Sequence, residues 1–305
     1  MTDAVAGILQ AQLIARISQR ALRGMQLGEW EPTRHPVDAG SSLALDDQDF
    51  MPDLGPGLVS STARFPAMNA TENVVAAGQV FSAALTQERK LRTASVATLC
   101  RSAVEASAKT IWLLSDTDRA VRRARCLGSI ERESEAQSRD IDIEEATFAI
   151  RIDEARHAEY QRFQQRRQKF NERLEAIASL PESARERPPD STGYLLQAAA
   201  WIDANPPADP FGELESLGMS LLARSFCSVG SSFAHGLRWV REYMQRETDL
   251  LRLTVIGFAS AVSMTECALA LLEAQSINAD SRATRAQSYP AGIAATVASW
   301  SVRYQ

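Results

Sequence analysis

The sequence predicts an all-α protein: a helical bundle with a long charged helical hairpin and an irregular N-terminal arm. Three observations favour this fold class. No stretch of the 305 residues shows the sustained polar–apolar alternation of a half-buried strand. Apolar residues instead recur every three or four positions, which is the spacing of one helix face. Residues 118–179 contain no proline and a single glycine, Gly128, as expected of long helices.

The N-terminal part, residues 1–68, is expected to hold one helix and one arm. Across residues 3–27 an apolar residue returns at every fourth position, which predicts an amphipathic helix (Val5, Leu9, Leu13, Ile17 and Ala21). Residues 28–68 carry nine of the 27 glycines and prolines of the chain, so they predict an irregular linker or wrapping arm.

The bundle domain is expected over residues 69–275. Asn69 followed by Glu72 resembles a capping box, and it predicts the start of a helix that runs to about Leu114. Residues 118–179 then mix charges of both signs around a thin apolar seam. This composition predicts a helical hairpin or coiled-coil arm inserted in the bundle, with a break around Ile141–Ile143.

The last third of the chain predicts shorter helices around one apolar helix. Residues 180–212 hold eight glycines and prolines and are expected to be mostly irregular. The expected elements are a short helix at 194–202, a helix from Glu213, a glycine-broken segment at 230–236, helices at 237–246 and 249–275, and a polar tail at 276–305.

One segment, residues 253–272, is apolar enough to be either a membrane span or a buried core helix. Its length suits a bilayer, which needs about 20 residues, but an apolar helix is also typical of the centre of a large helical protein. We expect the core helix and no membrane contact. Glu266 is the only formal charge in this segment, and a buried carboxylate needs a partner, so we expect an arginine of the bundle to face it.

Composition limits the classes of function. The formal net charge is −5, which disfavours general coating of nucleic acid but leaves room for a local basic patch. The four cysteines form no C-x-x-C pair, so we expect free thiols in the reducing cytoplasm. Glu154 and His157 have the spacing of a di-iron ligand pair, but they occur once and on a charged helix. We therefore expect no metal and no cofactor.

Three groups of residues are candidates for chemistry. Arg101 and Glu105 are four residues apart and interrupt an apolar helix, so they form either an ordinary ion pair or part of a buried polar cluster. His235 follows Ser232 in a run of small residues that ends at Gly236, and such residues let a substrate approach closely. A lone histidine of this kind is either structural or catalytic.

The third group is basic. Arg119, Arg122 and Arg125 open the charged hairpin, and residues 119–130 contain no acidic residue. They form either a phosphate-binding patch or an ordinary solvated helix face.

Several of these residues together resemble a known group of proteins. The pattern comprises Arg101, Ser102, Glu105, Trp112, Asp118, Arg122, Arg125, Ser231, His235 and Gly236. Over residues 95–275 it is similar to actinobacterial-type helical proteins, and more distantly to HEPN domains. The resemblance implies a helical bundle, often dimeric, of the kind that includes metal-independent ribonucleases of toxin and phage-defence systems.

The chain departs from the HEPN nuclease motif, in which an arginine and a polar residue precede the histidine by a short spacer. The nearest arginine before His235 is Arg224, and Arg151 precedes His157 at a suitable spacing but is followed by Ile152. The resemblance then implies that Arg101 replaces the missing arginine. His235 would transfer the proton, Arg101 would stabilise the phosphate and Glu105 would orient one of them, with Ser232 and the three hairpin arginines near the substrate.

The alternative is a non-catalytic protein that forms oligomers or holds a protein partner. In that case residues 118–179 are the interaction arm. The large apolar residues expected at the contact are Phe148, Ile152, Phe163 and Phe170.

Overall fold

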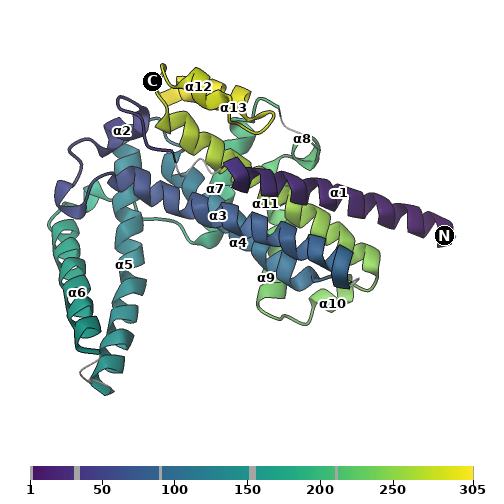
Figure 1. Cartoon of the computed structure of the whole chain (residues 1–305), viewed down its shortest axis with the longest axis horizontal. Coiled ribbons are helices and arrows are strands. Elements are labelled where there is room, and N and C mark those ends of the chain that lie inside the picture. Colours follow the sequence, from purple (N-terminus) through teal and green to yellow (C-terminus); the bar gives the residue numbers. More distant parts are fainter. Residues whose placement is uncertain (1–2, 31–34, 89–90, 151–155, 210–211, 305) are drawn as a thin grey trace. The chain divides into compact units, whose positions relative to one another are not determined.

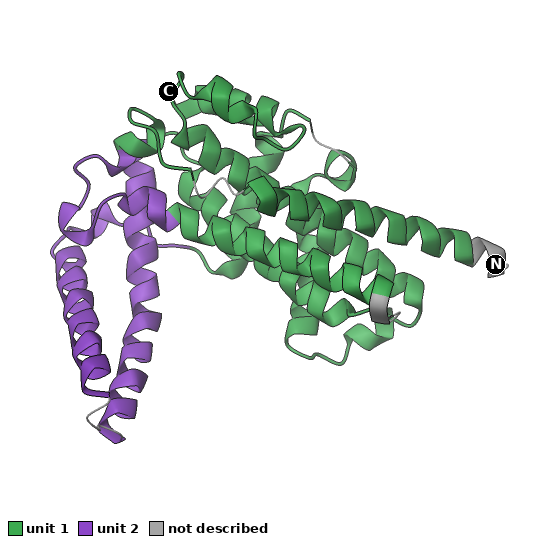
Figure 2. Cartoon of the chain, viewed as in Figure 1, with its two compact units in different colours: residues 1–45, 63–117, 189–305 green, residues 46–62, 118–188 purple. Residues whose placement is uncertain are grey.

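The structure is a computed structural model that describes all residues except 1–2, 31–34, 89–90, 151–155, 210–211 and 305. The described residues form helices and turns and contain no strand, which confirms the all-α prediction (Figure 1). The chain divides into two compact units (Figure 2). Unit 1 contains residues 1–45, 63–117 and 189–305, and unit 2 contains residues 46–62 and 118–188.

Unit 1 is built mainly from long helices. Its elements are α1 (Asp3–Trp30), α2 (Ser42–Asp47, which ends in unit 2), most of α3 (Leu58–Ala83), a π-helical turn (Ala84–Glu88), α4 (Thr93–Leu114), α7 (Ser191–Ala204), α8 (Glu213–Leu217), α9 (Met219–Ala234), α10 (Val240–Tyr243), α11 (Glu247–Ser276), α12 (Arg282–Ala286), α13 (Ile293–Ser301) and a final 3₁₀ turn (Val302–Tyr304).

The central element of unit 1 is α11, which contacts α1, α4, α9 and α13. Among the described residues it is the one helix long and apolar enough to cross a membrane, and 89% of its most apolar window is buried. Two of its buried polar side chains are hydrogen-bonded within the unit: Thr265 and Ser107 share a hydrogen bond of 3.0 Å, and the Gln275 side chain donates to the Leu114 carbonyl at 2.8 Å. This burial is that of a core helix, as the sequence predicts.

The first helix, α1, lies on α11 and α3 through the predicted apolar stripe. Leu13, Ile17 and Ala21 are buried. Gly24 continues this face, and a Cβ built there would lie 2.2 Å from Cγ1 of Val74 on α3. Glycine at this position therefore lets the two helices approach more closely than a side chain would allow.

The predicted arm is shorter than expected, because α3 begins at Leu58 and not at Asn69. A carboxylate distant in sequence caps this helix: Asp47 Oδ1 accepts from the backbone N–H groups of Val59 and Ser60, at 2.7 and 3.2 Å. Pro66 lies inside the helix, where it removes one backbone bond without ending it. The predicted single helix to Leu114 is also wrong, because α3 ends at Ala83 and α4 starts at Thr93.

Unit 2 contains the predicted hairpin, formed by α5 (Arg119–Ile150) and α6 (His157–Ala178). It also contains two 3₁₀ turns, Pro52–Leu54 and Glu182–Ala184. The predicted break at Ile141–Ile143 is wrong, since α5 continues to Ile150. Gly128 lies against the backbone of Glu186, and a Cβ there would meet the Glu186 carbonyl oxygen at 1.9 Å.

The apolar residues of the hairpin seam are buried inside unit 2. Phe148, Phe163 and Phe170 are 8%, 1% and 4% exposed, and the rings of Phe148 and Phe163 lie 5.4 Å apart. These three residues therefore do not form an exposed interface, which corrects the expectation that they face a partner. Ile152 lies outside the described residues. Self-association through other parts of 118–179 stays a prediction.

The C-terminal segment, residues 276–305, is not a loose polar tail. It forms α12 and α13, and Trp300 on α13 is 2% exposed against Trp201 of α7, with ring centroids 5.0 Å apart. Its arginine Arg285 joins Asp38 at 2.7 Å and Glu273 of α11 at 3.2 Å. The segment is thus part of the core of unit 1.

Candidate nucleic-acid interface

Arg101 and Glu105 lie one turn apart on α4 and bind each other. The Arg101 Nε donates to Glu105 Oε1 at 2.8 Å, and the two side chains are 20% and 38% exposed. Cys227 of α9 lies in their electrostatic range. Burial and the nearby Glu105 raise the pKa of its thiol and Arg101 lowers it, which leaves the pKa at about 12. This thiol is therefore protonated at neutral pH and is not an activated nucleophile.

His235 is exposed at the C-terminal end of α9, as its capping residue. The structure joins two of the three predicted catalytic residues by an ion pair, and within the described residues no hydrogen bond or ion pair joins the His235 ring to Arg101 or Glu105. The backbone after His235 adopts a conformation that ends α9. Gly236 (φ +63°) donates to the Phe233 carbonyl at 3.2 Å, and Leu237 donates to the Ser232 carbonyl at 2.8 Å. These two bonds form a Schellman motif.

The glycine after His235 is therefore explained by helix termination. We predict that Gly236→Ala destabilises unit 1 by about 1–2 kcal/mol, because a Cβ is unfavourable in the left-handed conformation. Urea unfolding followed by circular dichroism measures this loss. Gly7→Ala is the matched control, since Gly7 lies inside α1 with nothing within 4 Å of an added Cβ. An equal loss in both variants would contradict the assignment of the cap.

Two of the predicted substrate-binding residues are buried and bonded to other residues of the protein. Ser232 is 2% exposed and its hydroxyl donates to the Ser228 carbonyl at 3.2 Å. Arg122 is also 2% exposed, and it holds Asp46 through two bonds of 2.6 and 2.7 Å. Neither side chain is accessible to a substrate, which corrects both expectations.

The other two hairpin arginines also contact carboxylates of unit 2. The Arg125 Nε lies 3.1 Å from Glu186, and its side chain is 13% exposed. The Arg119 Nε lies 3.3 Å from Asp46, although 47% of its side chain is exposed. The basic start of α5 is therefore mainly an internal ion-pair cluster of unit 2, and the predicted phosphate patch is reduced to Arg119.

Aromatic residues that sequence reasoning missed lie just after His235. The predicted helix at 237–246 is wrong: only Val240–Tyr243 is helical. Trp239 precedes this single turn and Tyr243 is its last residue, and their ring centroids lie 5.6 Å apart with an interplanar angle of 87°. They are 38% and 68% exposed, and Leu237 beside them is 48% exposed.

Exposed arginines accompany these rings. Arg238, Arg241 and Arg246 are all exposed, and Glu242 is the one acidic residue in 235–246. We call residues 235–246 the basic–aromatic segment. The sequence did contain a signal for this segment: arginines alternate with aromatic residues directly after the glycine that ends the helix. The apolar spacing of Leu237, Val240 and Met244 obscured it by suggesting a packed helix.

The described residues contain no group of three or more histidine, cysteine, aspartate or glutamate side chains that could hold a metal ion. The basic–aromatic segment itself presents an exposed imidazole, guanidinium groups and aromatic faces.

No known protein family, curated protein or solved structure matches this chain.

Proposed function

We propose that this protein binds single-stranded RNA through its basic–aromatic segment, residues 235–246. The observation that carries the proposal is the exposure of Trp239 and Tyr243 among exposed arginines. Proteins hold single strands by stacking bases on aromatic side chains, and each such base contributes about 1–3 kcal/mol. Arginine side chains supply the attraction to phosphate.

Charge complementarity supports a nucleic acid at this place. The segment holds three arginines and one glutamate, while the whole chain has a formal net charge of −5. An acidic protein with a local basic segment is suited to a short contact with RNA and not to coating it. The exposed His235 adds a group that can donate to or accept from a ribose hydroxyl.

Binding without cleavage is the form of the proposal that the geometry favours. Cleavage by the mechanism expected from the HEPN resemblance needs His235 beside Arg101, because the proton transfer and the stabilisation of charge occur at one phosphate. Arg101 instead binds Glu105, and no contact with His235 is present among the described residues.

The test is fluorescence anisotropy with a short labelled single-stranded RNA of mixed sequence. We expect the double variant Trp239→Ala/Tyr243→Ala to weaken binding at least about tenfold, because two stacking faces are lost. Phe65→Ala is the matched control, since Phe65 is 71% exposed on α3 and lies outside the segment. We expect it to bind like the wild type. Circular dichroism checks that each variant is folded.

The same RNA, run on a denaturing gel after incubation, tests for cleavage. We expect intact RNA with the wild type and with His235→Ala. Cleavage that disappears in His235→Ala would restore the nuclease interpretation. No binding by the wild type, or equal weakening in Phe65→Ala, would refute the proposed interface.

A further inference from the structure

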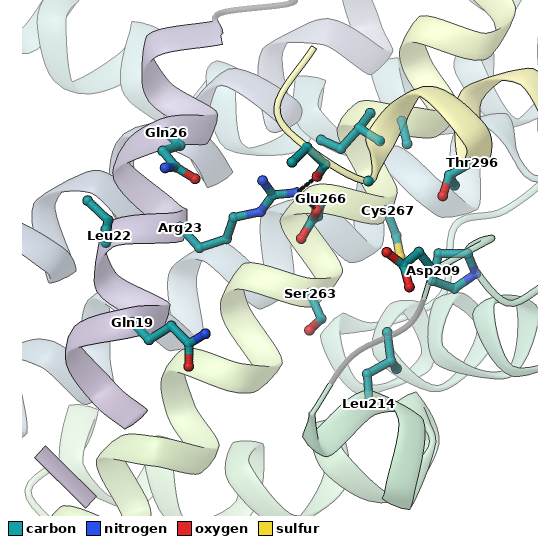
Figure 3. A pocket seen from close by; sticks show the side chains of 15 residues that line it. Gln19, Leu22, Arg23, Gln26, Asp209, Leu214, Ser263, Glu266, Cys267 and Thr296 are labelled. Atoms are coloured by element: carbon teal, nitrogen blue, oxygen red, sulfur yellow. Dashed lines mark hydrogen bonds and ion pairs between the residues drawn. The ribbon is translucent and has the colours of Figure 1, made fainter. Parts of the chain in front are cut away.

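Unit 1 contains a pocket of about 330 Å³ between α1, α11 and α13 (Figure 3). This volume is at the lower end of the range typical of small-molecule sites, about 300–1,000 Å³. The pocket is distinct from the basic–aromatic segment, because none of the residues that line it belongs to 235–246.

Most of the pocket wall is apolar. Leu22 of α1, Ala270 of α11 and Ile293 of α13 line it, together with Leu214. Cys267 also faces the pocket, and burial raises the pKa of its thiol well above the usual range. The thiol is thus a neutral, weakly polar part of the wall. A ligand that fills this space needs an apolar body.

One carboxylate of the wall has an unused oxygen. Arg23 forms an ion pair with Glu266 through Oε1, and the same nitrogen of Arg23 donates to the Ala291 carbonyl at 2.8 Å (Figure 3). This contact confirms the expectation that an arginine faces Glu266. The other oxygen of Glu266, Oε2, accepts no hydrogen bond from any described residue. It remains an acceptor for a group inside the pocket.

A second carboxylate lines the same pocket. Asp209 accepts no hydrogen bond and forms no ion pair with the described residues, and it lies on the exposed side of the pocket. Burial raises the pKa of Glu266, Arg23 and Arg20 lower it, and Asp209 raises it. The lining therefore holds two carboxyl groups and one guanidinium, and it carries an excess of negative charge when both carboxyl groups are ionised.

We propose that this pocket binds a small organic amine, with its apolar body against α1 and α13 and its ammonium group between Glu266 and Asp209. An ammonium offers the N–H donors that Glu266 Oε2 and Asp209 lack, and it neutralises the negative excess. A carboxylate ligand would add a third anion beside these two. A neutral ligand of the same shape would fill the apolar space but bring no cation to Glu266 Oε2 or to Asp209.

The experiment compares three probes of one shape, benzylamine, benzyl alcohol and benzoate, by isothermal titration calorimetry with the full chain. We expect saturable binding of benzylamine that is at least about tenfold tighter than binding of the alcohol, since hydrogen bonds to charged groups are the stronger ones. We expect no detectable binding of benzoate.

Two variants locate the bound amine. Asp209→Asn is expected to weaken benzylamine binding about tenfold without lowering the thermal midpoint, because Asp209 forms no hydrogen bond or ion pair with the described residues. The control Asp280→Asn changes an exposed aspartate outside the pocket, and we expect wild-type affinity. Ala270→Leu fills the space between the helices, and it should abolish binding of the amine in a protein that still unfolds cooperatively.

Three results would overturn the proposal: no saturable binding of benzylamine, equal affinity for the amine and the alcohol, or undiminished binding of the amine by both Asp209→Asn and Ala270→Leu. None of these results depends on RNA binding. The proposal for the pocket and the proposal for the basic–aromatic segment are therefore tested independently.

Discussion

Replacing Asp46 with alanine is expected to destabilise unit 2 by about 3–5 kcal/mol. The Asp46 side chain is fully buried and accepts two hydrogen bonds from the nearly buried Arg122. Arg119 contacts the same carboxylate at 3.3 Å, and Arg123 donates to the Asp46 backbone carbonyl at 2.7 Å. Removal of the carboxylate would take away the anion that accepts two hydrogen bonds from the buried guanidinium of Arg122, and removing one partner is the costly way to break a buried ion pair.

Urea unfolding and peptide-resolved hydrogen exchange measure this effect. Exchange should increase in α5 and in residues 46–62, which belong to the same unit. Asp49→Asn is the matched control, because Asp49 is exposed and asparagine tolerates its positive φ of 55°. The double variant Asp46→Ala/Arg122→Met should recover much of the lost stability, since it removes the buried cation together with the anion. A loss below about 1 kcal/mol in Asp46→Ala would mean that the buried pair is not a main stabilising contact of unit 2.

Replacing Phe163 with alanine is expected to cost about 3–5 kcal/mol and to separate the two helices of the hairpin. Phe163 is 1% exposed, and its ring lies 5.4 Å from Phe148 and 6.1 Å from Tyr160. The hairpin has few other large buried side chains, and its outer faces carry charges such as Arg166 and Glu144, which pair across the two helices. Loss of this ring therefore removes a large share of the apolar area that joins α5 to α6.

Helicity by circular dichroism and hydrogen exchange across 119–178 measure the outcome. Ile143→Ala is the control, because Ile143 lies on the same hairpin but is 67% exposed, so we expect a change within about 0.5 kcal/mol. A wild-type melting curve for Phe163→Ala would contradict the assigned hairpin core. Light scattering of the same variants tests self-association separately, since an exposed interface would respond to Ile143 and not to Phe163.

The candidate site divides into a part that local sequence predicts and a part that it does not. Arg101 and Glu105 are four residues apart on one helix, so their contact follows from helix geometry alone. The sequence placed His235 in a glycine-broken segment at 230–236, whereas α9 continues through Gly230 to Ala234 and His235 caps it. The exposure of Trp239 and Tyr243 was not predictable in the same way, because apolar spacing indicates a buried face whether or not another element covers it.

The sequence by itself determined the fold class, the boundaries of the hairpin and the need for a partner of Glu266. Each of these follows from interactions within a few residues or from the cost of burying an unpaired charge. Only the tertiary structure decided which groups distant in sequence meet. Arg23 and Glu266 are 243 positions apart, Arg122 and Asp46 are 76 apart, and Asp47 caps α3 from 12 positions away. Apolar periodicity and isolated charges indicate that a residue needs a partner. The packing of the helices determines which residue is that partner, because the contact energy depends on position in space and not on position along the chain.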